Sequence, residues 1–350
     1  MKSSVMQNTL PAQRRGTQLS QTIRAIDWWE YKLSPMFATI YATAFLSNLA
    51  IISLWPLFLL ALVALVPGAA YVSVINDLTD MEDDLASGKS NRLAGKSQTF
   101  IALMLACSIL PGIAVAIYWR NDPLLLSLYL AAWAAFSLYS IPPVRLKSRG
   151  VLGILADASG AHLFPTLLVV SLVFRWRAVD PFDIVWFAAV AAWSLSYGLR
   201  GILWHQLSDL PNDEHVGLRT FARRHKITRL HVLGNFVIFP VEATAFAVIL
   251  WRVGSRFAVV FLCLYALLEW LRKGMWKMNL VIVAPKDRYH IVMHEYYEVF
   301  YPLALLLSSA TRYPQDALMI AAHLFLFPRR ATQTLKDIVK LLKQVIRRFI

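Results

Sequence analysis

The chain has 350 residues, of which 58% are hydrophobic and 16% are charged, and its mean hydropathy is +0.52. This composition lies outside the usual range of soluble globular domains and indicates an integral membrane protein. The formal net charge of +14 is also typical of nucleic-acid-binding proteins, but in a membrane protein anionic lipid headgroups and basic cytoplasmic loops explain it better. We therefore expect membrane lipids, and no nucleic acid, among the partners.

The first 26 residues are polar and basic, with Lys2, Arg14, Arg15 and Arg24. They contain no short apolar core followed by a small-residue cleavage site, so they are not a signal peptide. We expect a cytoplasmic amino-terminal tail over residues 1–26.

Nearly uncharged runs then recur along the chain, at 33–53, 54–75, 99–119, 124–141, 151–174, 182–204, 230–251, 256–271 and 296–311. Most of them reach the length of about 20 residues that a helix needs to cross a bilayer. They lack the alternation of barrel strands, and the lipid core leaves helices as the remaining option. The expected fold is an all-α polytopic membrane bundle of about nine transmembrane helices, in one domain over residues 27–312.

The orientation follows from the basic residues of the short loops. The loops after the second, fourth, sixth and eighth spans carry 16 Lys and Arg, and the intervening loops carry 5. The positive-inside rule places the first set on the cytoplasmic side, and we expect a bacterial inner membrane.

The carboxyl-terminal extension, residues 313–350, conflicts with this count. Nine spans send the chain end outward, yet the tail is basic. The apolar piece 317–327 is too short to span alone and is expected to be re-entrant or interfacial. Beyond it, Ile338, Leu341, Leu342 and Ile346 share one face of a helix and lysines occupy the other, as in a helix that lies on a membrane surface. The side on which the tail lies stays open.

Two acidic clusters follow equivalent spans, four spans apart. In NDLTDMEDD, residues 76–84, Asp77, Asp80 and Asp84 stand at i, i+3 and i+7 and are expected on one helix face beside Asn76. In HQLSDLPNDEHVGLRT, residues 205–220, Asp209 and Asp213 are four apart. Crowded carboxylates repel one another unless a cation neutralises them.

Mg²⁺ is the natural neutraliser, because it takes oxygen ligands and bridges carboxylates to substrate phosphates. Two such clusters on one membrane side, each followed by basic residues, predict a site that binds a diphosphate through Mg²⁺. The alternative is that each cluster caps a span and is solvated, but the paired positions and the helical spacing argue against it.

Three stretches in order resemble the motifs of UbiA-superfamily intramembrane prenyltransferases. Residues 76–84 resemble the first motif, NDxxDxxxD, and Asp209-x-x-x-Asp213 with Gly217 and Thr220 resembles the second. Between them, YSIPPVRLKSRG at 139–150 resembles the family's Tyr-Ser-x-Pro-Pro-x-Arg-Leu-Lys loop. The sequence departs from the family pattern where Asn91-Arg92-Leu93 replaces Arg-Pro-Leu and where Asn212-Asp213 replaces Gly-Asp.

The resemblance implies nine helices around a central cavity that is open to lipid, with two Mg²⁺ ions and an isoprenyl diphosphate donor. It assigns one ion to Asn76, Asp77, Asp80 and Asp84 and the other to Asp209 and Asp213, and it places Tyr139 and Lys147 near the diphosphate and the reacting carbon.

The expected reaction ionises the allylic diphosphate, and Mg²⁺, with Lys89, Arg92, Arg145 or Lys147, stabilises the leaving anion. Aromatic rings such as Tyr139 stabilise the allylic cation.

Other polar groups near the spans are open to two interpretations. Asp157 is expected to contact the acceptor or a catalytic group. Arg200 either holds phosphate or pairs with a carboxylate. His205 either orients Asp209 or touches the acceptor, or it is structural. The spacing of His290, His294 and Glu298 suggests zinc only superficially.

The leading interpretation is an Mg²⁺-dependent prenyltransferase of isoprenoid biosynthesis that acts on an acceptor, most simply an aromatic ring, although a lipid acceptor stays open. The alternatives are a UbiA-type terpene cyclase, a phosphoribosyl-type transferase that acts on a polyprenyl phosphate, and a membrane transporter or lipid-binding protein.

Overall fold

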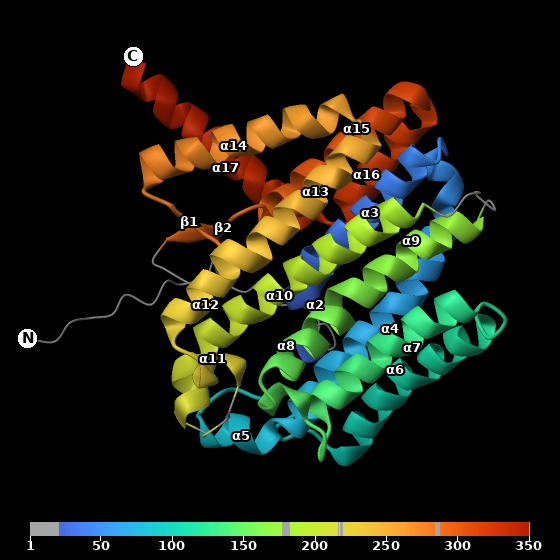
Figure 1. The fold of residues 1–350 in the computed structure, drawn as a ribbon, viewed down its shortest axis with the longest axis vertical. Helices are drawn as coiled ribbons and strands as arrows, with labels where there is room; N and C mark the ends of the chain where they lie inside the picture. Colours follow the sequence, from blue (N-terminus) through green and yellow to red (C-terminus); the bar gives the residue numbers. More distant parts are fainter. Residues whose placement is uncertain (1–20, 177–182, 216, 218–219, 284–287, 350) are drawn as a thin grey trace, which may run out of the picture.

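The computed structural model describes residues 21–176, 183–215, 217, 220–283 and 288–349, and within these the chain is a bundle of long helices (Figure 1). In chain order the helices of the first half are α2 (Ala25–Trp28), η1 (Trp29–Leu33), α3 (Ser34–Leu46), η2 (Ile51–Leu54), α4 (Trp55–Thr79), α5 (Met81–Ala86), α6 (Gln98–Tyr118), α7 (Pro123–Ser140), η3 (Leu146–Ser148), α8 (Val151–Ala158), η4 (Ser159–Leu163) and α9 (Phe164–Trp176).

The second half contains α10 (Ile184–His215), α11 (Phe221–Arg224), α12 (Ile227–Leu233), η5 (Gly234–Ile238), α13 (Phe239–Val253), α14 (Arg256–Trp276), η6 (Tyr296–Phe300), α15 (Tyr301–Arg312), η7 (Pro314–Asp316), α16 (Ala317–Leu326) and α17 (Pro328–Phe349). Two short parallel strands, β1 (Asn279–Val281) and β2 (Tyr289–Ile291), join α14 to η6.

The expected all-α polytopic membrane fold is confirmed. Five helical stretches of the described residues are long and apolar enough to cross a bilayer: Ile51–Thr79, Gln98–Tyr118, Pro123–Ser140, Val151–Trp176 and Ile227–Val253. The number of nine spans stays a prediction. The expected boundary between the first two spans was wrong, because α3 ends at Leu46 and the residues from Ile51 onward already belong to the second helical stretch.

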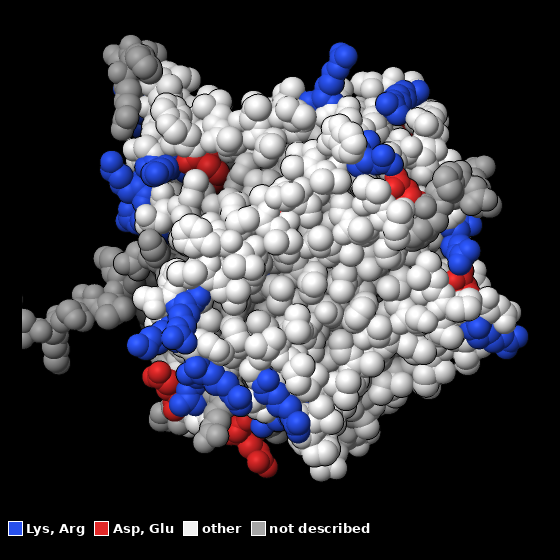
Figure 2. Space-filling view, viewed as in Figure 1, with Lys and Arg blue, Asp and Glu red and all other residues white. Residues whose placement is uncertain are grey.

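The surface supports a membrane location. In Figure 2 a broad central area carries no charged side chain, while Lys and Arg gather at the lower-left end and along the upper and right-hand edges. Large apolar side chains such as Leu110, Tyr118, Phe236 and Trp251 are exposed, which costs free energy in water but not in hydrocarbon. The chain is an integral membrane protein.

Local sequence signals explain where several helices begin. The side chains of Ser97, Asp122 and Ser255 each accept a hydrogen bond from the backbone N–H three residues later. These bonds satisfy donors that a helix leaves free in its first turn. Pro123 stands at the first position of α7, where its missing N–H costs nothing.

The carboxyl-terminal extension packs against the bundle along its whole length. At its start the Asp316 carboxylate accepts hydrogen bonds from the N–H groups of Ile51 and Ile52, at 2.8 and 2.9 Å. Further on, Trp29 donates to the Leu326 carbonyl at 2.7 Å, and Asp337 pairs with Arg272 at 2.8 Å. In Figure 1, α17 runs beside α14 toward the upper left, whereas α5 and α11 lie at the lower left of the bundle. The division into residues 1–26, 27–312 and 313–350 stays a prediction, and residues 1–20 lie outside the described part.

The expected membrane-surface helix over α17 stays a prediction, and the structure shows how its apolar residues are placed. Leu341 is buried and Ile338 packs against the core. Leu342 and Ile346 are exposed, together with Leu335 and Val339. The apolar surface of α17 is wide enough for one edge to face the bundle and the other to face its surroundings.

Candidate active site

The first acidic cluster lies where α4 gives way to α5. α4 ends at Thr79, and Asp80 links it to α5 through two backbone bonds, from Asp80 N–H to the Asn76 carbonyl at 3.0 Å and from Asp84 N–H to the Asp80 carbonyl at 2.8 Å. The helical path thus continues through the junction, and residues four apart share a side. Asn76, Asp80 and Asp84 accordingly line one cavity.

This cavity, which we call the acidic cavity, has a volume of about 140 Å³. Its walls come from α4, α5, α7, η3 and α10 and from the segments next to them. Its lining residues are Asn76, Asp80, Asp83, Asp84, Ser87, Lys89, Tyr139, Lys147, Ile202, His205, Gln206, Asp209, Asp213 and Thr220. Both acidic clusters and the loop between them therefore meet at one site.

Asp77 does not line the acidic cavity, contrary to the assignment from the motif. Its carboxylate is buried and pairs with Arg24, and Arg92 lies 3.9 Å from it. Arg92 is also 3.6 Å from Asp27. The expected i, i+3, i+7 face was wrong because Asp77 is one residue out of phase with Asn76, Asp80 and Asp84. Arg92, which lies close to Asp77, also does not line the acidic cavity.

Basic side chains neutralise the carboxylates of the acidic cavity. Lys147 pairs with Asp80, and the Arg145 guanidinium donates to Asp80 at 2.9 Å and to Asp83 at 2.7 Å. Lys89 lies 3.4 Å from Asp209 and so links the first cluster to the second. Lys89 and Lys147 line the same space as the carboxylates, and such a combination of charges can bind a metal ion together with a diphosphate.

The second acidic cluster is fixed by the segment that follows α10. The Thr220 hydroxyl donates to the Asp213 carboxylate at 3.0 Å, and Gln206 accepts a hydrogen bond from the Ala222 N–H at 3.0 Å. Gly217 has a φ of 72°, in the left-handed region that favours glycine. The turn at Gly217 brings Thr220 back onto Asp213, which explains the spacing of the second motif.

The surroundings shift two pKa values at this site. Burial lowers the pKa of Lys147 to about 8, against the opposing attraction of Asp213. Burial also raises the pKa of Asp213, and the neighbouring Asp209 acts in the same direction, while the bond from Thr220 opposes it. Both groups favour their neutral forms more than they would in water. A bound cation would stabilise the charged form of Asp213, and a bound anion would stabilise the charged form of Lys147.

Arg200 has a structural position and does not line the acidic cavity. Its guanidinium donates twice to Glu242, at 2.8 and 2.6 Å, and once to the Val292 carbonyl at 2.8 Å. Both partners of this ion pair are fully buried. Of the two interpretations that the sequence left open, pairing with a carboxylate is the one the structure shows.

The structure also brings in residues that the sequence analysis did not assign. Asp83, Ser87 and Gln206 line the acidic cavity, and Arg24 binds Asp77. Asp83 stands inside the acidic stretch 76–84, so its charge could have indicated it. Arg24 lies far away in the sequence, and only the packing of the chain brings it to Asp77.

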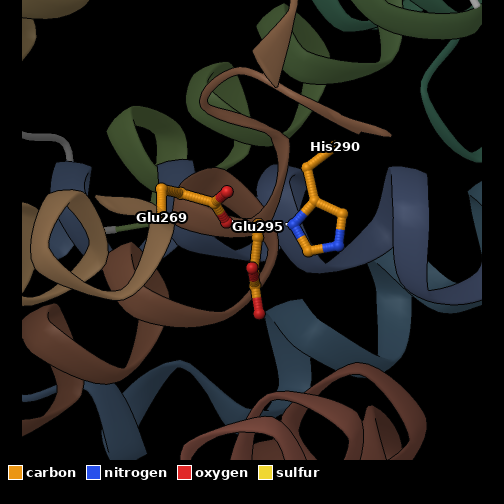
Figure 3. Close-up of side chains that lie close together, drawn as sticks. All are labelled: Glu269, His290 and Glu295. Atoms are coloured by element: carbon orange, nitrogen blue, oxygen red, sulfur yellow. Dashed lines mark hydrogen bonds and ion pairs between the residues drawn. The ribbon is translucent and has the colours of Figure 1, made fainter. Parts of the chain in front are cut away.

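A separate group of side chains has the spacing of a metal site. Ligand atoms of Glu269, His290 and Glu295 lie within 4.8 Å of one another (Figure 3). Arg272 already occupies this space, with 2.6 Å to Glu269, a further pairing with Glu295 and 2.8 Å to Asp337. Its guanidinium supplies the positive charge that a metal ion would bring, so the group forms a buried ion-pair network. His294 and Glu298 lie apart from it, and Glu298 pairs with Arg330 at 2.6 Å.

No family model matches the chain. Similar sequences are a 2-acylphloroglucinol 4-prenyltransferase of Humulus lupulus, 26% identical over 212 residues (56% of this chain and 49% of the relative), and a probable chloroplastic homogentisate phytyltransferase 2 of Oryza sativa subsp. japonica, 25% identical over 217 residues (59% and 55%). The chain thus spans about half the length of the curated relatives it matches.

Similar solved structures are those of a UbiA homologue from Archaeoglobus fulgidus. The form bound to GPP and Mg²⁺ has a TM-score of 0.52 at 15% identity, covering 92% of this chain and 100% of the other. The form bound to DMAPP and Mg²⁺ has a TM-score of 0.50 at 15% identity, covering 92% and 99%. At this identity the likeness shows the fold. The chain therefore has the helix arrangement of a UbiA homologue and is similar in sequence, over little more than half of its own length, to plant prenyltransferases.

Proposed function

We propose that the protein is an Mg²⁺-dependent prenyltransferase that transfers a prenyl group from an isoprenyl diphosphate to an aromatic acceptor within the membrane. The observation that carries this proposal is the convergence of Asp80, Asp84, Asp209 and Asp213 on one cavity that Lys89 and Lys147 also line. The names of the plant relatives and the GPP, DMAPP and Mg²⁺ bound to the archaeal homologue support it.

The donor set of the acidic cavity fits Mg²⁺. Four motif carboxylates and the Asn76 side-chain carbonyl offer hard oxygen ligands. In the residues that the structure describes, the Asn76 oxygen accepts only a long bond from Ser140, at 3.3 Å, and so has a lone pair to spare. When bound, Mg²⁺ would supply Lewis-acid stabilisation of the leaving diphosphate. We leave Asp77 out of the proposed ligand set, because it pairs with Arg24 and does not line the acidic cavity.

The side chains of the acidic cavity would bind and orient the diphosphate. Lys89 and Lys147 would donate to its oxygens, and Arg145 would hold Asp80 and Asp83 in place. Tyr139 would present its ring to the allylic carbon, where a desolvated cation–π contact contributes about 2 kcal/mol. The aromatic wall and the anion-binding wall lie in the same cavity, as ionisation of an allylic diphosphate requires.

The acidic cavity would open on the cytoplasmic face, because the basic loops gather at this end of the bundle. A bacterial inner membrane stays a prediction, since the two relatives named above are plant proteins, one of them chloroplastic, and the structural neighbour is archaeal.

Product analysis tests the proposal. Protein purified in nanodiscs would receive Mg²⁺ and a series of prenyl diphosphates, each with and without a panel of phenols, and products would be identified by mass spectrometry. A prenylated phenol that is lost with EDTA and in Asp80→Asn supports the transferase. Diphosphate release that needs no acceptor and gives a terpene replaces it with the cyclase, and no release with any donor rejects both.

A further inference from the structure

Four ionisable side chains lie inside the bundle, next to the acidic cavity but outside its metal-binding wall. They are Lys32 on η1, Asp157 on α8, His162 on η4 and His205 on α10. α10 packs directly against α8 and η4. We call these four residues the inner polar cluster.

The members of the inner polar cluster are within electrostatic range of one another. Asp157 interacts with Lys32 and His205, and His162 interacts with the same two residues. Tyr139, which lines the acidic cavity, interacts with Asp157 and also with Asp209 and Asp213. The inner polar cluster therefore adjoins the acidic cavity through His205, which belongs to both, and through Tyr139, which lines the cavity.

The cluster lacks the partners that buried polar groups normally have. Among the described residues, none of the four side chains forms a hydrogen bond or an ion pair within 4 Å. Lys32, Asp157 and His162 are half-buried, and His205 is exposed where it lines the acidic cavity, so each keeps accessible side-chain surface. Polar side chains that lie among packed helices, keep accessible surface and have no partner are typical of a ligand site.

The backbone gives an independent indication. Lys32 and His162 both lie in π-helical turns, Trp29–Leu33 and Ser159–Leu163. Such turns are rare and are frequent at functional sites, because the extra residue redirects a side chain. Gly198 of α10 keeps this space narrow, since a Cβ there would come within 3.0 Å of the His162 ring and of the Ala158 backbone.

We infer that the inner polar cluster binds the acceptor of the proposed reaction and that this acceptor is a phenol. A phenolic hydroxyl would donate a hydrogen bond to the Asp157 carboxylate, and its oxygen would accept one from the Lys32 ammonium. His162 and Tyr197, whose rings lie 4.9 Å apart edge to face, would form an aromatic side of the site. The hydrogen bond to Asp157 increases electron density on the phenol ring, which favours attack on an allylic cation formed beside Tyr139. The C–O bond to diphosphate breaks with both electrons on the diphosphate, the ring carbon forms the new C–C bond, and the proton lost from that carbon passes to the diphosphate. This inference rests on the proposed function.

Binding of 4-nitrophenol tests it, because the visible absorption band of this probe moves toward that of the phenolate when a carboxylate accepts its hydroxyl proton in a hydrogen bond. The probe would be titrated into nanodisc-embedded protein at a pH below its own pKa. Wild type is expected to bind with a shifted band. Asp157→Asn and Lys32→Met are each expected to bind at least tenfold more weakly and without the shift, while Mg²⁺-dependent binding of geranyl diphosphate changes less than twofold.

Control variants separate this result from misfolding and from the proposed function. The exposed residues Glu82 and Lys336 give the matched controls Glu82→Gln and Lys336→Met, which should bind the probe as wild type does. The double variant Lys32→Met/Asp157→Asn removes both charges together, so neither remains buried without the other. It should still bind geranyl diphosphate, and this binding shows that it is folded.

Probe binding that is unchanged in that double variant overturns the inference, as does the absence of probe binding by wild type. If wild type binds the phenol through Lys32 and Asp157 but never binds geranyl diphosphate, the phenol site stands and the proposed donor chemistry fails.

Discussion

At the residue scale, Asp77 and Asp80 show that the side of the helix on which a carboxylate lies decides its role. Both are acidic and both stand in the first motif, yet Asp80 lines the acidic cavity and Asp77 is held by Arg24 on the other side of the helix. The motif in the sequence predicts the same metal-ligand role for both carboxylates. Their partners in the structure differ and indicate different roles.

Replacing these carboxylates one at a time should separate the two roles. Asp80→Asn is expected to lower Mg²⁺-dependent turnover at least 100-fold with little change in melting temperature, because it removes a ligand oxygen charge. Asp77→Asn is expected to cost about 1–2 kcal/mol of stability, because it removes a charge-assisted bond to a partly exposed arginine, and to keep its apparent Mg²⁺ affinity. Turnover against Mg²⁺ concentration and thermal unfolding measure the two effects. Equal loss of Mg²⁺ affinity in both variants would return Asp77 to the ligand set.

Lys147 should make donor binding depend on pH. Its pKa is lowered to about 8, so the side chain loses its positive charge as the pH rises through that value, and the affinity for diphosphate should fall in the same window. Lys147→Arg keeps its charge and should show no such fall, whereas Lys147→Met should bind about tenfold or more weakly at every pH. The pH profile of kcat/KM for the donor measures this, because that quantity reports groups of the free enzyme. A wild-type profile that is flat between pH 7 and about 9 contradicts the assignment.

At the scale of elements, α17 depends on contacts that lie far away in the sequence. The Glu30 carboxylate accepts hydrogen bonds from the N–H groups of Arg329 and Arg330, at 2.8 and 2.6 Å. It thereby satisfies two free donors at the amino-terminal end of α17 and places a negative charge there. The capping residue comes from the first helical segment, 299 and 300 residues away.

Removing this cap should loosen α17 without unfolding the bundle. Glu30→Ala is expected to destabilise the start of α17 by about 1–2 kcal/mol, so its amides should exchange with solvent roughly 5–30 times faster. Glu30→Gln keeps an acceptor oxygen and should show a smaller effect, and Glu82→Ala, at an exposed acidic position, should show none. Hydrogen exchange followed by mass spectrometry measures it. Unchanged exchange in Glu30→Ala would show that side-chain packing alone holds α17.

At the scale of the whole molecule, the course of the carboxyl-terminal extension bears on the conflict between span count and tail charge. α16 starts beside Ile51, and α17 then passes Arg272, while Gln344 accepts a hydrogen bond from Trp276, at the end of α14, at 2.7 Å. The extension therefore returns across the bundle, and its basic end lies beside the end of α14. We expect this end on the same membrane side as the basic loops, because the positive-inside rule applies to both.

Cysteine labelling in sealed vesicles should verify this arrangement. In a background with Cys107→Ala and Cys263→Ala, Lys343→Cys and Glu82→Cys are expected to react with a membrane-impermeant maleimide from the same side. Asn121→Cys, in the loop between α6 and α7, should react from the opposite side. Labelling of Lys343→Cys together with Asn121→Cys would place the tail on the other face and reject the returning extension.

The sequence by itself determined the fold class and most of the acidic cavity. Long apolar runs form helices in a bilayer, because every backbone polar group must be paired within its own helix. The carboxylates that follow two such runs at helical spacing either face one another across a site or are solvated. Asn76, Asp80, Asp84, Tyr139, Lys147, His205, Asp209 and Asp213 all line the site as a consequence of patterns that the chain carries locally.

Only the tertiary structure decided what those residues meet. The pairing of Asp77 with Arg24, the burial of Arg200 against Glu242, the network of Arg272 and the enclosure of Lys32 with Asp157 each join segments that are distant along the chain. Periodicity predicts which side of its own helix a residue occupies, and it carries no information about which helix faces that side. The physical reason is that side-chain partners depend on how the helices pack against one another, which the spacing of residues within one helix does not fix.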